Sequence, residues 1–280
     1  MTADRSGPSE STAAADPLGL AMLAHHRDEP GQLVYRDGTD VRDGNVAEFY
    51  FSSPESWAPA TVTVLDRVAE REPILDVGCG AGKHLLWWDE RGVEAIGVDV
   101  SPTAVRTARE RCEVRSTARR SGDAAERGVG GVLAGDMFDL PVATGAVGAV
   151  HAVGTQIGLG RSLAGIRDLL REFARVTDDA GVAVVDNYDP ARLDDDFLGY
   201  RSDPREGIAH RCFHLEFVRE TNGEQRREVG PTLQFLLCSP GRLREATVGT
   251  PWTTARVSRT DEDGHYSLEL RKGNRDGPTK

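Results

Sequence analysis

The stretch ILDVGCGAGKH, residues 74–84, constrains the fold of this chain more than any other part of the sequence. Its first residues are apolar and predict a buried strand, and an apolar run from Leu85 predicts a helix behind it. Between them stand Gly78, Gly80 and Gly82, where a Cβ would keep the backbone from turning sharply and from touching a nucleoside-sized ligand. We therefore predict a strand, a glycine loop and a helix, with a ligand bound at the carboxyl end of the strand.

From Ile74 onward, short strand-like runs alternate with amphipathic helices, a pattern typical of a parallel sheet covered on both faces. The expected strands are residues 74–77, 95–98, 132–134, 147–153 and 182–185, and the clearest helix carries Leu163, Ile166, Leu170, Phe173 and Val176 on one stripe. A polar segment between Arg115 and Gly130 is expected to be a surface insertion. The pattern predicts the α/β class, with residues 59–190 as its core.

The N-terminal residues lack this alternation. Residues 1–18 are small and polar and predict a flexible tail. Residues 19–58 are expected to form an N-terminal extension or lid, with one helix starting near Leu18 and another near Ser53.

After Pro190 the pattern becomes antiparallel. Alternating apolar residues over 213–217, a turn at Asn222-Gly223 and a return strand at residues 233–237 predict an inserted β-hairpin or cap over residues 211–238. The remainder of the part 191–274 is expected to be a short helix from Ser239 and a final hairpin turning at residues 261–264, before a tail at 275–280.

Composition limits the partners. The formal net charge is -11, and phosphate backbones are bound mainly through Lys and Arg, so we expect no nucleic acid partner. Lysine occurs only at positions 83, 272 and 280, a balance that resembles the acidic proteins of salt-loving organisms. The four scattered cysteines predict reduced thiols. Because no apolar run could span a bilayer, we expect a cytoplasmic monomer or homodimer without a membrane partner.

Spacing separates the glycine loop from two other nucleotide-binding loops. A dinucleotide-binding loop needs its third glycine one position later, where this chain has Lys83. A phosphate-binding loop needs Ser or Thr after Gly-Lys, where this chain has His84. Three glycines at alternate positions after Asp76 resemble instead the first motif of the class I S-adenosylmethionine-dependent methyltransferases.

The resemblance continues at the next two strand ends. Asp99, followed by Val100, stands where the family's acid accepts hydrogen bonds from the ribose hydroxyls. Asp136 and Met137 stand where an acid meets the adenine amino group and an apolar side chain packs on the ring. The match spans about residues 60–190 and implies a doubly wound, Rossmann-like, mostly parallel seven-stranded sheet with an antiparallel C-terminal strand. It implies S-adenosyl-L-methionine as cofactor, with contacts from Asp76, Gly78, Cys79, Gly80, Gly82, Asp99, Val100, Asp136, Met137 and Gly154.

The loops after the fourth and fifth strands should face the transferred methyl group. Together with a lid residue upstream they give the expected substrate pocket, made of Tyr50, Thr155, Gln156, Asn187 and Tyr188. A protein base is needed only if the nucleophile carries a proton, and the candidates are Tyr188, Asp189 and His151. His151 is also expected to be a hydrogen-bonded core residue. We expect His84 to face solvent or cap its helix, and we expect no metal site.

Motifs that this sequence lacks exclude some classes of methyl acceptor. Gly-Thr-Gln-Ile follows the fourth strand, where amino-directed DNA methyltransferases carry Asn/Asp-Pro-Pro-Tyr/Phe, and no cysteine follows a proline as in cytosine C5 enzymes. The resemblance therefore implies a small-molecule acceptor. A non-catalytic protein that binds S-adenosylmethionine or S-adenosylhomocysteine stays open. So does another enzyme on this fold, an aminopropyltransferase or a nicotinamide-dependent oxidoreductase, although Lys83 argues against the latter.

Overall fold

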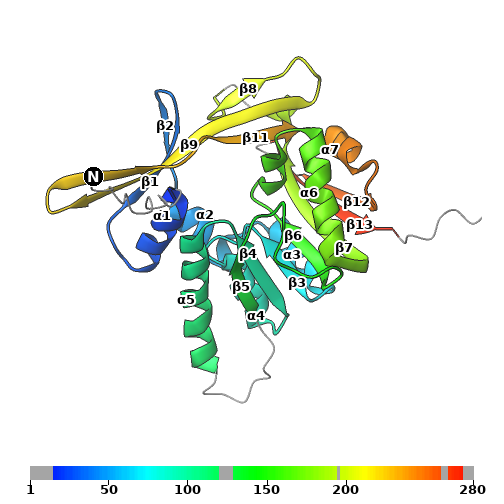
Figure 1. The fold of residues 1–280 in the computed structure, drawn as a ribbon, viewed down its shortest axis with the longest axis horizontal. Coiled ribbons are helices and arrows are strands. Elements are labelled where there is room, and N and C mark those ends of the chain that lie inside the picture. The colour runs from blue at the N-terminus through cyan, green and yellow to red at the C-terminus, as the bar shows by residue number, and fades with distance from the viewer. Residues whose placement is uncertain (1–14, 120–128, 194–195, 260–263, 274–280) are drawn as a thin grey trace, which may run out of the picture.

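A seven-stranded sheet forms the centre of the molecule (Figure 1). The computed structural model describes residues 15–119, 129–193, 196–259 and 264–273. The strand order is β12-β13-β7-β6-β3-β4-β5, and only β13 runs against the other strands. The strands are β3 (Ile74–Val77), β4 (Ala95–Asp99), β5 (Val129–Ala134), β6 (Val147–Ala152), β7 (Thr177–Tyr188), β12 (Trp252–Arg259) and β13 (His265–Lys272). This confirms the predicted Rossmann-like sheet with an antiparallel C-terminal strand.

Helices cover both faces of this sheet, which explains why β3 and β6 are buried along their whole length. The helices are α3 (Pro59–Ala69), α4 (Lys83–Glu90) and α5 (Pro102–Arg119) on one face, and α6 (Leu163–Val176) and α7 (Pro240–Thr247) on the other. The predicted stripe of α6 is its buried face: Ile166, Leu170 and Phe173 are fully buried, and each contributes about 1.5–3 kcal/mol by leaving water. Helix α6 begins where Ser162 accepts a hydrogen bond from the Gly165 amide.

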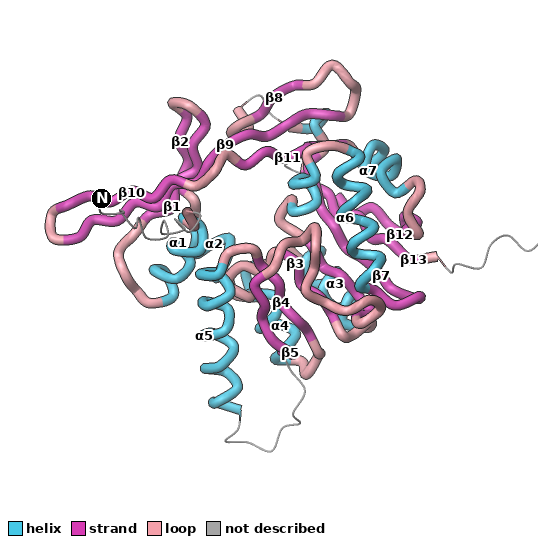
Figure 2. Tube along the Cα trace, viewed as in Figure 1, coloured by secondary structure: helices cyan, strands magenta, loops and turns pink. Residues whose placement is uncertain are grey.

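A second sheet, here called the cap sheet, lies over the carboxyl ends of the parallel strands (Figure 2). Its strands are β1 (Gln32–Asp37), β2 (Asp40–Asp43), β8 (Tyr200–Ser202), β9 (Ile208–Thr221), β10 (Glu224–Val229) and β11 (Leu233–Cys238). The long strand β9 pairs with β1, β8, β10 and β11. The N-terminal and C-terminal additions to the core are therefore joined in one sheet.

The remaining N-terminal elements connect the cap sheet to the core. They are α1 (Pro17–His26), α2 (Val46–Phe51) and the short 3-10 helix η1 (Pro54–Ser56), while η2 (Gln156–Gly160) and η3 (Pro190–Arg192) follow β6 and β7. Asp16 caps α1 by accepting from the Gly19 amide, and it also accepts from Ser101 Oγ at 2.7 Å. This pair of bonds ties the start of α1 to the loop after β4.

Several predicted boundaries differ from the structure. All five predicted strands form, but α1 starts at Pro17, inside the expected tail, whose residues 1–14 lie outside the described part. The expected insertion between Arg115 and Gly130 is wrong at both ends, because α5 continues to Arg119 and β5 starts at Val129; residues 120–128 are not described. The helix expected from Ser53 is only η1, and α3 follows it.

The predicted hairpin is part of a larger arrangement. Strand β11 pairs with β9 as predicted, but the strand that directly follows the turn at Asn222-Gly223 is β10, which was missed. Its sequence EQRREV is almost wholly exposed, so it lacks the apolar alternation that marks a strand. The final hairpin joins β12 and β13, and residues 260–263 of its turn are not described. Among the described residues, no helix is long and apolar enough to cross a membrane.

Candidate functional site

The glycine loop after β3 is closely surrounded. A Cβ on Gly78 would stand 2.7 Å from the Gln156 side chain, and one on Gly80 would stand 3.3 Å from Met22 and Tyr50. Both glycines have positive φ, 72° and 52°, which glycine adopts at little cost. The loop therefore requires glycine at these two positions, as the sequence predicted.

Asp99, at the end of β4, is hydrogen-bonded to this loop. Its two carboxylate oxygens accept from the backbone amides of Gly80 and Ser101, each at 2.9 Å. Burial raises the pKa of the Asp99 carboxyl. Each oxygen keeps a further lone pair, so Asp99 can accept hydrogen bonds from the hydroxyl groups of a ligand that lies over the loop.

The third motif stands beside the second at the same edge of the sheet. The Gly135 amide, after β5, donates to the Asp99 carbonyl oxygen at 3.0 Å. Asp136 is exposed and accepts from the Phe138 amide, and Met137 packs partly buried against the core. Val100 is 75% exposed. The strand ends thus bring all three sequence motifs together, as expected for a parallel sheet.

The loop after β6 is held by a buried acid that the sequence analysis missed, Asp186 of β7. Its carboxylate accepts from the Gly154 amide at 2.8 Å and the Thr155 amide at 2.6 Å, and contacts His265 Nε2 at 2.9 Å. Asp186 thereby fixes the loop that faces the glycine loop. An acid near the end of a buried strand was the signal that could have identified it.

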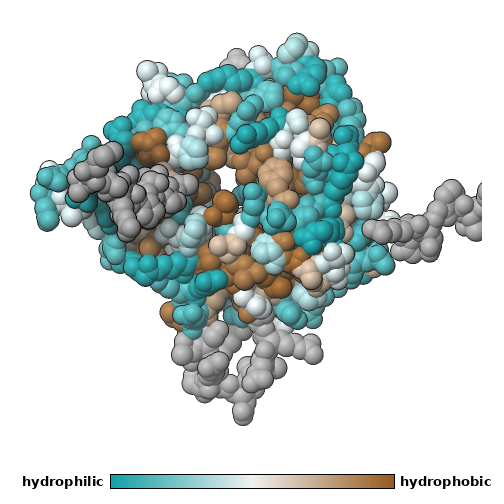
Figure 3. Space-filling model, viewed as in Figure 1, coloured by the Kyte–Doolittle hydropathy of each residue, from teal (hydrophilic) through white to brown (hydrophobic). Residues whose placement is uncertain are grey.

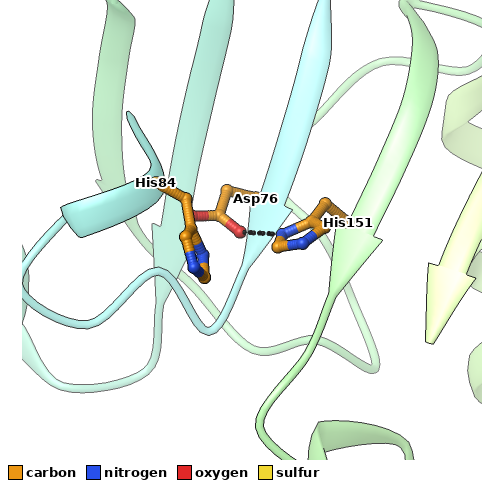
Figure 4. Close-up of side chains that lie close together, drawn as sticks. All are labelled: Asp76, His84 and His151. Carbon is orange, nitrogen blue, oxygen red and sulfur yellow. Dashed lines mark hydrogen bonds and ion pairs between the residues drawn. The ribbon is translucent and has the colours of Figure 1, made fainter. Parts of the chain in front are cut away.

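Asp76, His84 and His151 lie side by side at the base of the site (Figure 4). His151 Nδ1 is 2.8 Å from Asp76 Oδ1, and both side chains are almost fully buried. An ionised carboxylate only accepts hydrogen bonds, so Nδ1 is the donor in this pair, and in a neutral imidazole with that tautomer Nε2 is the nitrogen with the lone pair. Asp76 Oδ2 is buried without a hydrogen-bond partner.

His84 joins this cluster instead of facing solvent or capping its helix, so that expectation is wrong. Its ring meets the ring of His151 edge-on at 5.0 Å, with Trp57 on another side at 5.4 Å. Burial lowers the pKa of His84 well below its ordinary value, so the ring is neutral at pH 7. One ligand atom from each of Asp76, His84 and His151 lies within 4.8 Å of the others. The absence of a metal site was expected, yet these residues have a donor set that suits Zn²⁺.

These groups open into one cavity of about 680 Å³ between the cap sheet and the seven-stranded sheet (Figure 3). The predicted site residues that line it are Tyr50, Asp76, Gly78, Cys79, Gly80, His151, Gly154, Thr155, Gln156 and Tyr188. Those that do not line it are Gly82, Asp99, Val100, Asp136, Met137, Asn187 and Asp189. Burial raises the pKa of Cys79 well above its ordinary value, so this thiol is neutral.

Two predicted residues have structural roles instead. Asn187 is fully buried and donates to the Leu236 carbonyl oxygen at 3.0 Å, because successive side chains of β7 point to opposite faces of the sheet. Asp189 caps η3 and pairs with Arg259 at 3.0 Å. The placement of Asn187 in the substrate pocket and of Asp189 as a base is therefore corrected.

Sequence reasoning missed the cavity residues that come from the cap sheet and its connections, because no motif marks them. They include Tyr35, Phe197, Leu198, Arg211 and His265. Lys83 at the start of α4 stands inside the glycine motif but was not predicted as a site residue, and it also lines the cavity. Burial lowers the pKa of Lys83. The side-chain oxygens of Tyr35 and Tyr50 are hydrogen-bonded to each other.

Comparison with known proteins identifies the core. Residues 74–181 match the family model described as a methyltransferase domain. No curated protein sequence matches the chain.

Several solved methyltransferase structures have a similar fold. A methyltransferase from Bacteroides fragilis, in complex with S-adenosyl-L-homocysteine, is similar with a TM-score of 0.66 and 18% identity, covering 92% of this chain and 95% of that one. A sugar N-methyltransferase from a Streptoalloteichus species has a TM-score of 0.57 and 18% identity, covering 98% and 99%. An amino pentose methyltransferase from Micromonospora echinaspora, bound to S-adenosylmethionine and involved in calicheamicin biosynthesis, has a TM-score of 0.51 and 22% identity. That match covers 78% of this chain and 92% of the other. With the matched family model, these likenesses show that the chain carries a methyltransferase domain at residues 74–181 and has the fold of S-adenosylmethionine-dependent methyltransferases.

Proposed function

We propose that this protein transfers a methyl group from S-adenosyl-L-methionine to a small molecule bound in the cavity between the cap sheet and the core. The observation that carries the proposal is that the glycine loop after β3, the loop after β6 and His151 all line the same cavity. In this proposal residues 59–190 bind the cofactor, while residues 19–58 and 191–274 complete the acceptor side.

The residues of the loop and strand ends suit this cofactor. Gly78 and Gly80 let the backbone approach a nucleoside, and Asp99 accepts hydrogen bonds from the ribose hydroxyls. Asp136 accepts a hydrogen bond from the adenine amino group, and Met137 packs on the adenine ring. S-adenosylmethionine supplies a methyl group on a positively charged sulfur. The cavity end of β3 carries the Asp76 carboxylate, which favours a cation there. No pyrophosphate would be favoured beside these acids.

His151 is the proton acceptor in this proposal. It lines the cavity and Asp76 holds its Nδ1–H, so Nε2 is free to take the proton that an amine or hydroxyl acceptor loses as its bond to the methyl carbon forms. Asp76 then balances the positive charge on the ring. Tyr188 also lines the cavity and serves as a wall of the acceptor pocket.

Relatives on the same fold support a small acceptor, because two of them are named for sugar substrates. We therefore propose an amine or a hydroxyl on a polar small molecule as the methylated group.

The test is to incubate the protein with S-adenosylmethionine and a panel of amino sugars, sugars and hydroxylated aromatic acids, and to follow products by mass spectrometry. We expect S-adenosylhomocysteine together with one product heavier by one CH₂ group. The Asp99→Ala variant should form neither. Cofactor binding without turnover on any acceptor would favour a non-catalytic binder. A product that carries the aminocarboxypropyl chain of S-adenosylmethionine instead of its methyl group would contradict the methyltransferase proposal.

A further inference from the structure

Arg211 occupies an unusual place for an arginine in this acidic chain. It lies on β9 and lines the cavity, and its guanidinium carbon stands 4.4 Å from the Phe197 ring centroid and 4.6 Å from that of Phe213. Its Nε donates to the Leu198 carbonyl oxygen at 3.0 Å. The two rings and this bond fix the plane of the guanidinium.

Arg211 has no acidic partner among the described residues, where no carboxylate oxygen lies within ion-pair distance of it. Two other arginines of this part of the molecule are paired, Arg259 with Asp189 and Arg201 with Asp37. The chain has 45 acidic and 34 basic residues, so a missing partner does not follow from a shortage of carboxylates. Arginine cannot lose its proton, and a buried unpaired charge is costly. The arrangement therefore makes sense if the partner comes from outside the chain.

The two terminal nitrogens of Arg211 are the groups left for that partner. Among the described residues these two nitrogens make no hydrogen bond, unlike Nε, and they are not among the fully buried side-chain atoms without a partner, so they keep some exposure in the cavity that Arg211 lines. Nitrogens in this fixed fork match the two oxygens of a carboxylate or a phosphate. The ionisable groups that act on Arg211 are the phenols of Tyr35 and Tyr188, and neither is a carboxylate.

We propose that Arg211 is an anion-binding residue of the acceptor pocket, and that the methyl acceptor carries a carboxylate or phosphate group. This deepens the proposed function and rests on it for the identification of the pocket. The negative groups of the two ligands then bind at different ends of the cavity.

The anion that binds Arg211 could instead be the carboxylate of the cofactor. The side chains that stand between the glycine loop and Arg211 argue against this alternative. Tyr50 lies beside Gly80 of the glycine loop and is hydrogen-bonded to Tyr35. The Tyr35 ring packs on Phe213 at 5.1 Å, and Phe213 flanks Arg211. Arg211 is thus separated from the glycine loop by the tyrosine pair and belongs to the acceptor side.

The experiment measures calorimetric binding of inorganic phosphate, phenyl phosphate, benzoate and neutral benzamide to the full chain at constant ionic strength. The variants are Arg211→Gln, Arg211→Lys and the control Arg201→Gln, which removes another arginine of the cap sheet, one that is paired and 53% exposed. S-adenosylhomocysteine is titrated into each protein in parallel.

We expect phosphate, phenyl phosphate or benzoate to bind the unchanged protein and Arg201→Gln equally, and benzamide to bind neither. Arg211→Gln should raise the dissociation constant at least about tenfold, and Arg211→Lys by less, because lysine keeps the charge but not the fork. S-adenosylhomocysteine affinity should be the same in all four proteins, which also shows that they are folded.

Three results would overturn the inference. One is saturable anion binding that Arg211→Gln leaves unchanged, and another is that none of the three anions binds the unchanged protein. The third is a matching loss of S-adenosylhomocysteine affinity in Arg211→Gln, which would assign the residue to the cofactor. If S-adenosylhomocysteine binds none of the proteins, the cofactor proposal itself fails, whatever the anions do.

Discussion

Asp99 links the chain's first two motifs, because one carboxylate holds the glycine loop and the start of the segment after β4. Replacement by Asn keeps the size but turns one acceptor oxygen into a donor group, so a ribose hydroxyl and one loop amide lose their partner. We predict that Asp99→Asn weakens S-adenosylhomocysteine binding at least about tenfold, measured by calorimetry. Asp168→Asn, on the exposed face of α6, is the control and should bind normally. Equal affinities of the two variants would remove Asp99 from the cofactor site.

His151 gives a second prediction at this scale. His151→Asn keeps a polar side chain but cannot take up a proton, so the turnover number for a protonated acceptor should fall by about 10²–10⁴-fold while S-adenosylhomocysteine affinity is kept. The control is His214→Asn, which alters another histidine–carboxylate pair, in the cap sheet. Turnover unchanged in His151→Asn would refute the assigned proton acceptor.

The same cluster allows a direct decision between a base and a metal ligand. If His151 is the base, treatment with a chelator followed by dialysis leaves turnover unchanged. Loss of turnover that Zn²⁺ restores would show instead that Asp76, His84 and His151 hold an ion.

Individual residues were predictable from sequence where a fixed spacing carries the chemistry. Asp76, Gly78, Gly80 and Asp99 stand at intervals set by one turn and one parallel neighbour, so their meeting in space follows from the pattern. Arg211 could not be found this way, because its place depends on which strand of the cap sheet faces the cavity.

At the scale of elements, the hydrogen bonds of Glu172 on helix α6 connect this helix to the rest of the core, and their contribution to stability can be tested. Glu172 accepts from Arg175 and from the Leu140 amide, which joins α6 to the segment after β5. The hydrogen bond from Arg175 and the Leu140 amide lower the pKa of Glu172. A carboxyl whose pKa is lower in the folded than in the unfolded state stabilises the fold above its unfolded pKa and loses that effect as the pH falls through its folded value.

We therefore predict that Glu172→Gln lowers the free energy of unfolding by about 1 kcal/mol at pH 7, measured by urea denaturation. The difference from the unchanged protein should shrink as the pH falls below the ordinary value of 4.5. Asp168→Asn removes an exposed pair on the same helix and should change the stability by less than about 0.5 kcal/mol at either pH. A Glu172→Gln deficit that stays constant with pH would contradict this account.

Elements with strong periodicity were predicted well. The strands of the parallel sheet and α6 were found because burial on one or both faces leaves a clear apolar pattern. Strand β10 was missed because its side chains are almost all exposed, and the last turn of α5 was predicted as part of a surface insertion because its sequence is polar. Backbone pairing and helix continuation stabilise such segments without an apolar signature.

For the whole molecule, the decisive feature is that β1 pairs with β9, which brings the N-terminal extension onto the C-terminal half. This pairing makes the cap sheet one unit and closes the cavity over the glycine loop. It could not be predicted from sequence, because a contact between distant segments leaves no local spacing. The joining of the N-terminal and C-terminal additions was therefore not predictable.

The central claim, that the glycine loop and the neighbouring strand ends bind the methyl donor, is tested most directly by calorimetric titration of the full chain with S-adenosylmethionine, S-adenosylhomocysteine and NAD in molar potassium chloride. The account predicts micromolar binding of the first two at one site per chain and none of NAD, because acids stand at the strand ends where a pyrophosphate would be repelled. Binding of NAD alone, or of none of the three, would contradict it.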